Sequence, residues 1–152
     1  MPDAGAGRSV QLLSIDILRQ ANMSTETRLF CLRIALVVVG LIAIFGLYPL
    51  SLLWPSGWAW GHGHSHYLTM IVGLYATLGV FLLIASRDPQ AHRSLIWFTV
   101  WSSIVHGGIM AVQAIQDGAE RGHLLGDVPA LFLIALVLAC LMPKPAEGKL
   151  TR

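Results

Sequence analysis

Four long apolar segments alternate with short polar ones along the chain. They cover residues 30–53, 67–86, 94–115 and 124–142. A helix needs about 20 apolar residues to cross the hydrocarbon core of a bilayer, and it satisfies its own backbone hydrogen bonds there. The pattern therefore predicts an all-α protein with four transmembrane helices. The short connections predict that successive helices pack as antiparallel neighbours in one bundle.

Composition agrees with this class. Of 152 residues, 55% are hydrophobic and 12% are charged, whereas a soluble domain carries about 25% charged residues. We expect one membrane domain over residues 30–142, between an N-terminal segment, 1–29, and a tail, 143–152. Residues 8–21 fit either a short interfacial helix or a partly disordered segment. The formal net charge of +2 gives no reason to expect a nucleic-acid partner.

Basic residues are concentrated on alternate connections. The N-terminal segment, the second connection and the tail all carry Lys or Arg, whereas the first connection has none and the third has only Arg121. The positive-inside rule therefore predicts that both termini are cytoplasmic. The first and third connections then share the outer face, where an aromatic belt is expected from Trp54, Trp58, Trp60 and Tyr67.

Histidines are concentrated in the first connection, at His62, His64 and His66. In an extended backbone these three side chains would point the same way, and imidazole is a common ligand of transition metals. The third connection adds further ligand types on the same predicted face. The hypothesis is an outer metal site, with zinc favoured by imidazoles and carboxylates and copper by an added thioether. Its candidate ligands are His62, His64, His66, Glu120, His123 and Asp127.

Two other interpretations of the histidine-rich connection are open. Gly57, Gly61 and Gly63 would make it a flexible polar turn with no ligand. Alternatively, it senses pH, because imidazole titrates near neutral pH.

The third span carries a polar stripe. Ser102, His106, Met110 and Gln113 are three or four residues apart and share one helical face. An ionisable residue at membrane depth indicates a functional site, although histidine also joins helices by hydrogen bonds. A haem ligand at His106 is conceivable, but Met110 on the same helix is poorly placed as the second axial ligand, and the chain has no CxxCH motif. Haem is therefore not expected.

The second connection, SRDPQAHRS, offers a weaker site. Arg87, His92 and Arg93 could hold an anionic lipid headgroup or a partner's carboxylate. Ordinary topology-determining charge is the favoured explanation. Cys31 and Cys140 belong to no paired motif and are expected to be free thiols. Hydrolase, phosphate-binding and HExxH motifs are absent, so no catalytic residue is assigned and an enzyme is not favoured.

Small residues recur at helix-packing spacings in three spans, for example at Gly40, Gly79 and Gly107. Such residues allow close helix contact. They fit packing within the bundle, a homo-oligomer or a larger membrane complex.

Residues 67–114, YLTMIVGLYATLGVFLLIASRDPQAHRSLIWFTVWSSIVHGGIMAVQA, with GHLLGDVPAL after them, resemble a family of small bacterial four-helix membrane proteins of unknown function. The resemblance covers about residues 67–142. It implies helical spans and the bacterial cytoplasmic (inner) membrane, and it supplies no activity.

Three functions follow as hypotheses. The first is a non-enzymatic protein that binds a metal at its outer face. The second is a structural or accessory subunit of a larger membrane complex. The third is a small transporter or membrane enzyme that uses His106 within the bundle.

Overall fold

The computed structural model describes residues 25–60 and 66–143, which are almost entirely helical. Four helical stretches in these residues are long and apolar enough to cross a membrane, which confirms the prediction of four apolar helices. The segment predicted as an interfacial helix lies outside the described residues. The four stretches are Thr25–Leu53, His66–Ala85, Arg93–Gln116 and Gly118–Leu141. The last begins before the predicted residue 124, because a 3₁₀-helix precedes its α-helix.

The first span, Thr25–Leu53, changes its winding halfway. Residues 25–41 are α-helical, Ile42–Gly46 form a π-helical turn, η1, and Leu47–Leu53 form helix α2. Pro49 lies just beyond the π-turn. It offers no N–H to the carbonyl four residues back, and its ring crowds that carbonyl. The wider π-turn before the proline eases this crowding.

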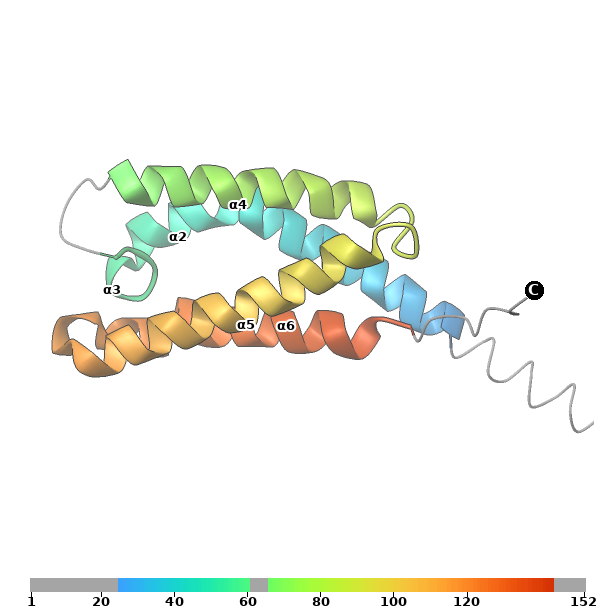
Figure 1. Ribbon diagram of the computed structural model, residues 1–152. Coiled ribbons are helices and arrows are strands. Elements are labelled where there is room, and N and C mark those ends of the chain that lie inside the picture. Colours follow the sequence, from blue (N-terminus) through green and yellow to red (C-terminus); the bar gives the residue numbers. More distant parts are fainter. Residues whose placement is uncertain (1–24, 61–65, 144–152) are drawn as a thin grey trace, which may run out of the picture.

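The helices form two hairpins (Figure 1). The first span pairs with α4 (His66–Ala85), and α5 (Arg93–Gln116) pairs with α6 (Asp127–Leu141). Gly40 and Gly79 lie back to back in the first hairpin, where a Cβ on Gly79 would be 2.6 Å from the Gly40 carbonyl oxygen. These two glycines therefore serve packing within the chain.

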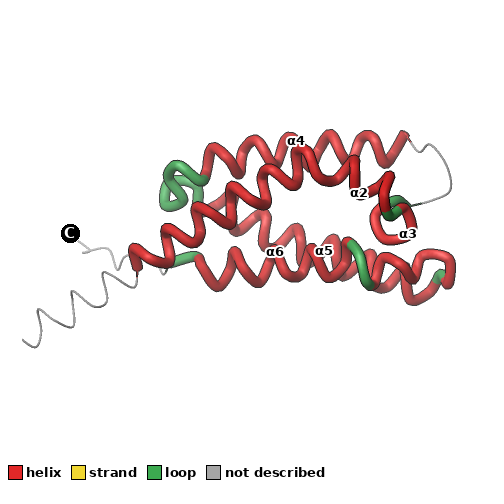
Figure 2. Tube along the Cα trace, turned by 180° about the vertical axis from the view of Figure 1, so that it is seen from behind, coloured by secondary structure: helices red, strands yellow, loops and turns green. Residues whose placement is uncertain are grey.

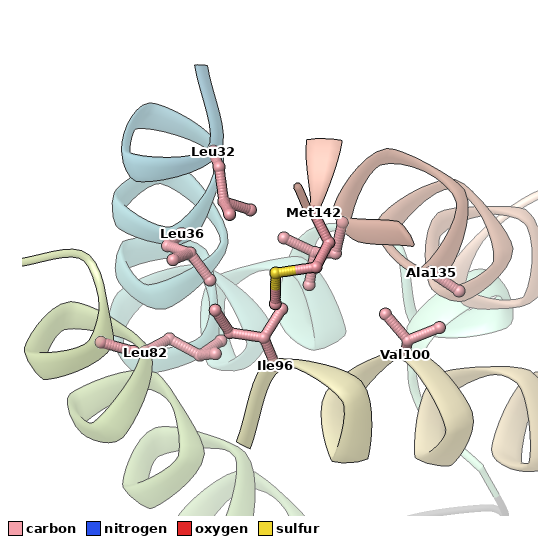
Figure 3. Close-up of a cluster of buried hydrophobic side chains, with 9 residues drawn as sticks. Leu32, Leu36, Leu82, Ile96, Val100, Ala135 and Met142 are labelled. Carbon is pink, nitrogen blue, oxygen red and sulfur yellow. The ribbon is translucent and has the colours of Figure 1, made fainter. Parts of the chain in front are cut away.

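The hairpins pack against each other at one end, here called the narrow end (Figure 3). Side chains from all four spans meet there in an apolar core. Leu36, Leu82, Ile96 and Leu138 are completely buried in it. The guanidinium of Arg28 also donates to the Cys140 carbonyl at 3.1 Å. Both ends of the described chain therefore lie at the narrow end (Figure 2).

At the opposite, wide end the hairpins diverge and are joined by two short helices (Figure 1). Helix α3 (Pro55–Trp58) packs on the 3₁₀-helix η2 (Gly118–Leu124). Glycines permit this contact, because a Cβ on Gly122 would collide with the Ser56 carbonyl, and one on Gly126 with the Gly57 carbonyl. The predicted antiparallel bundle is thus closely packed at one end and open at the other.

Candidate functional site

A cavity of about 810 Å³ lies between the two hairpins, with walls from all four spans. Toward the narrow end its wall is apolar, formed by residues such as Leu78, Leu82 and Ile134. Toward the wide end Trp58, the last residue of α3, and Trp60, two residues beyond it, line the cavity. Both were predicted to belong to an interfacial belt, and that assignment stays a prediction.

The predicted polar stripe of α5 faces this cavity in part. His106, Met110 and Gln113 all line it, and Met110 is 7% exposed. Ser102 does not line it, and its hydroxyl donates to the Thr99 carbonyl on the same helix at 3.2 Å. The neighbouring Ser103 lines the cavity instead. One residue corresponds to about 100° of helix rotation, so the sequence spacing located the face only approximately.

His106 contacts the opposite hairpin through Tyr75 of α4. Their ring centroids are 5.9 Å apart at an interplanar angle of 76°, an edge-to-face arrangement. Among the described residues, no hydrogen bond to the imidazole is present. His106 therefore contacts the other hairpin through its ring, and its nitrogens have no hydrogen-bond partner in the described chain.

A second group of polar side chains, the wide-end cluster, consists of Trp60, Glu120, His123 and Asp127. His123 is completely buried. Its Nδ1 lies 3.0 and 2.9 Å from the two carboxylate oxygens of Asp127. The ring of Trp60 stacks on His123 with centroids 4.2 Å apart, and its Nε1 donates to Asp127 Oδ2 at 3.3 Å. Asp127 thus accepts hydrogen bonds from two aromatic side chains that also stack on each other.

The other nitrogen of His123 points toward Glu120. Nε2 lies 3.2 Å from Glu120 Oε2, but the geometry is not that of a hydrogen bond, and this buried atom has no other partner in the described chain. Glu120 borders a second hollow of about 500 Å³, which shares Trp60 and Gln113 with the large cavity. Asp127 instead lines the large cavity with a side chain that is 13% exposed.

The described wall of the large cavity carries an acidic side chain and no Lys or Arg to balance it. Asp127 is the only carboxylate among the described residues that line it, and no Lys or Arg is among them. The indole Nε1 of Trp58, also on this wall, is buried and has no hydrogen-bond partner in the described chain. The wide end of the cavity therefore offers one acidic group, several aromatic rings and hydrogen-bonding groups on otherwise apolar walls.

The predicted metal ligands are brought together only in part. Glu120, His123 and Asp127 are in contact, but within residues 25–60 and 66–143 no three His, Cys, Asp or Glu side chains are arranged to hold a metal ion. His66, the first residue of α4, is exposed. His62 and His64 lie outside the described residues, so metal binding stays a prediction.

In the second connection, which was predicted to contact an anion, Arg93 forms hydrogen bonds within the chain. Arg93 donates to the Pro143 carbonyl at 2.8 Å and to Gln90 Oε1 at 3.0 Å. Its guanidinium therefore holds the end of the last span. Arg87 is exposed, and His92 directly precedes α5, so the binding of an anion there also stays a prediction. Cys31 and Cys140 are free, as expected.

Three features of the site were not predicted from the sequence. The pairing of His123 with Asp127 could have been found from their separation of four residues beside a helix start. Tyr75 could have been found as the one polar aromatic side chain well inside the second span. The place of Trp58 and Trp60 on the cavity wall had no local indication, because it depends on where α3 packs.

The sequence also matches a known family. The match is to the family of unknown function DUF6632, over residues 26–149. No curated protein and no solved structure matches the chain.

Proposed function

The chain belongs to this family of unknown function, and we propose that it is a membrane protein that binds an amphipathic molecule from the bilayer in the cavity between its hairpins. The observation that carries the proposal is the cavity of about 810 Å³ bounded by all four apolar spans. Small-molecule sites occupy about 300–1,000 Å³ and combine apolar walls with a few polar groups.

The distribution of side chains suggests how such a molecule lies. Its apolar part would contact Leu78, Leu82 and Ile134 toward the narrow end. Its polar group would lie toward the wide end, near His106, Gln113 and Asp127. In this arrangement the polar side chains that are costly at membrane depth face a ligand.

We further propose the bacterial cytoplasmic membrane as the location, with both termini in the cytoplasm. The Arg and Lys distribution supports this orientation. The described chain begins and ends at the narrow end, so the wide end with its cavity would face outward. A reporter enzyme that is active only in the cytoplasm should be active when it is fused after residue 152. The same reporter should be inactive when it is inserted between residues 118 and 119.

Native mass spectrometry of the detergent-purified protein tests the cavity. Wild-type protein should retain about one amphipathic molecule per chain. Ala130→Phe, which places a ring in the cavity, should lose it, whereas Leu133→Phe on the exposed face of the same helix should keep it. The proposal is wrong if Ala130→Phe retains the molecule while remaining folded, or if wild-type protein carries none.

Metal binding remains the second proposal, supported by the buried His123 Nε2 beside Glu120. It requires ligands from the histidine-rich connection in addition. About one zinc or copper ion per purified chain, absent from a His62/His64/His66→Ala variant, would support it. A role as an accessory subunit or homo-oligomer would instead appear as co-purification of a stoichiometric partner, without metal.

A further inference from the structure

We propose that the cavity is selective for amphipathic cations, such as a protonated amine or a quaternary onium group on an apolar body, with Asp127 as the counter-charge. This inference rests on the proposed function, and it names the chemical class of the ligand. It is argued from the charge, the aromatic lining and the free acceptor positions at the wide end.

Charge is the first step. Asp127 is the only carboxylate on the described cavity wall, and no Lys or Arg lies among the described lining residues. The nearest titratable partner is His123, whose other neighbour is Glu120. With both carboxylates ionised, the three side chains carry a net negative charge whether His123 is neutral or protonated. A cation would therefore complement this end of the cavity, whereas an anion would be repelled.

Hydrogen-bonding capacity is the second step. Asp127 accepts from His123 Nδ1 and Trp60 Nε1, which fixes the carboxylate in place. The backbone N–H of Val128 is a third donor. An ionised carboxylate has about four acceptor positions, so these three donors do not saturate it. The remaining positions are available to a ligand, because the Asp127 side chain is partly exposed and lines the cavity.

Aromatic rings are the third step. Besides the carboxylate, the wide half of the cavity is lined by Trp58, Trp60, Tyr67 and Tyr75. Aromatic rings attract cations through their quadrupole, and cages of such rings are a known way to bind quaternary ammonium groups. A single acidic group among aromatic walls is selective for cations with apolar substituents, because small hydrated cations would lose their water without replacement ligands.

Three phenyl-substituted probes of different charge test this. They are tetraphenylphosphonium (cation), triphenylphosphine oxide (neutral) and tetraphenylborate (anion), each titrated into protein in a non-ionic detergent by calorimetry. The cation should bind at one site per chain and at least about tenfold more tightly than either other probe, a difference of about 1.4 kcal/mol. Ala130→Phe should abolish this binding.

Substitutions then test which side chains make the cavity selective for cations. Asp127→Asn keeps the shape and removes the charge, and it should weaken the binding of the cation at least about tenfold and leave the neutral probe unchanged. Glu120→Gln is the comparison variant, because Glu120 does not line this cavity. It should weaken the binding of the cation less than Asp127→Asn does, since its charge acts from the other side of His123. Tyr75→Leu is a second variant that tests the proposal if Asp127→Asn does not fold. It should weaken the cation about threefold, in line with a cation–π contribution, without weakening the neutral probe.

The outcomes separate the two proposals. Equal binding of all three probes, or an Asp127→Asn variant that is folded and retains full affinity for the cation, would overturn the cation inference and leave a neutral-ligand cavity. Preference for tetraphenylborate would overturn it as well. Absence of binding for every probe would contradict the cavity function itself.

Discussion

The narrow and wide ends of this molecule are formed by the same apolar helices, which are closely packed at one end and separated at the other. At the narrow end, four spans meet in a core whose leucine and isoleucine side chains have no exposed surface. At the wide end, the hairpins are separated by a cavity and joined through α3 and η2. Helices in lipid associate mainly through van der Waals packing, so unfilled space forfeits contacts. The narrow end is therefore the closely packed part of the molecule, and the wide end is the part that holds the cavity.

The largest effect should come from separating the first hairpin. Gly79→Leu cannot be accommodated without moving backbone, since even a Cβ there would lie 2.6 Å from the Gly40 carbonyl oxygen. We expect it to lower the free energy of unfolding by about 3 kcal/mol, measured by thermal or denaturant unfolding in detergent. Gly73→Leu on the same helix is the control, because a Cβ at Gly73 meets no atom within 4 Å. Equal stability of the two variants would show that this crossing is not closely packed.

The next effect should come from opening the wide end. Gly126→Ala places a methyl group against the Gly57 carbonyl and should push α3 away from η2. We expect a loss of about 2 kcal/mol of unfolding free energy, together with a red shift of tryptophan emission as Trp58 and Trp60 become solvated. Gly118→Ala, in open space, should change neither measurement. An unshifted spectrum in Gly126→Ala would argue against the contact between α3 and η2.

The features predicted well from sequence are those that depend on local pattern. The four apolar helices follow from runs of about 20 apolar residues, which satisfy the length requirement of a bilayer without tertiary information. His106 and Met110 were correctly expected on one face, since three- and four-residue spacing defines a helix face. The small residues at Gly40 and Gly79 were correctly expected at a helix contact.

The features that depend on packing between distant segments were not predicted. The cavity exists because the hairpins diverge, and no single segment encodes their relative angle. Trp58 and Trp60 line the cavity beside the close contact between α3 and η2 that Gly122 and Gly126 permit, and no local pattern indicates that contact. Ser103, and not the predicted Ser102, lines the cavity. This difference corresponds to a helix rotation of one residue, which sequence spacing alone cannot resolve.

Two alanines on one helix allow the ends to be compared directly. Ala135 belongs to the narrow-end core and is 3% exposed, whereas Ala130 lines the cavity. Ala135→Leu should lower the free energy of unfolding by about 1.5 kcal/mol through overpacking. Ala130→Leu should change it by less than about 0.5 kcal/mol, because the added atoms enter empty space. Equal losses in matched unfolding experiments would mean that the cavity wall is as tightly packed as the core.

The smallest effect concerns the polar contact that accompanies the narrow-end core. Arg93 donates to the Pro143 carbonyl at 2.8 Å, just beyond the last turn of α6. Arg93→Gln should cost about 0.5–1 kcal/mol of unfolding free energy, the range of one partly buried hydrogen bond. Arg87→Gln in the same connection removes the same charge from an exposed position, so it should have little effect. Equal losses of unfolding free energy in the two variants would mean that the net charge of this connection, and not the hydrogen bond of Arg93, stabilises the protein. A loss confined to Arg93→Gln, with the affinity of the cavity for tetraphenylphosphonium unchanged, would show that the two ends can be altered independently.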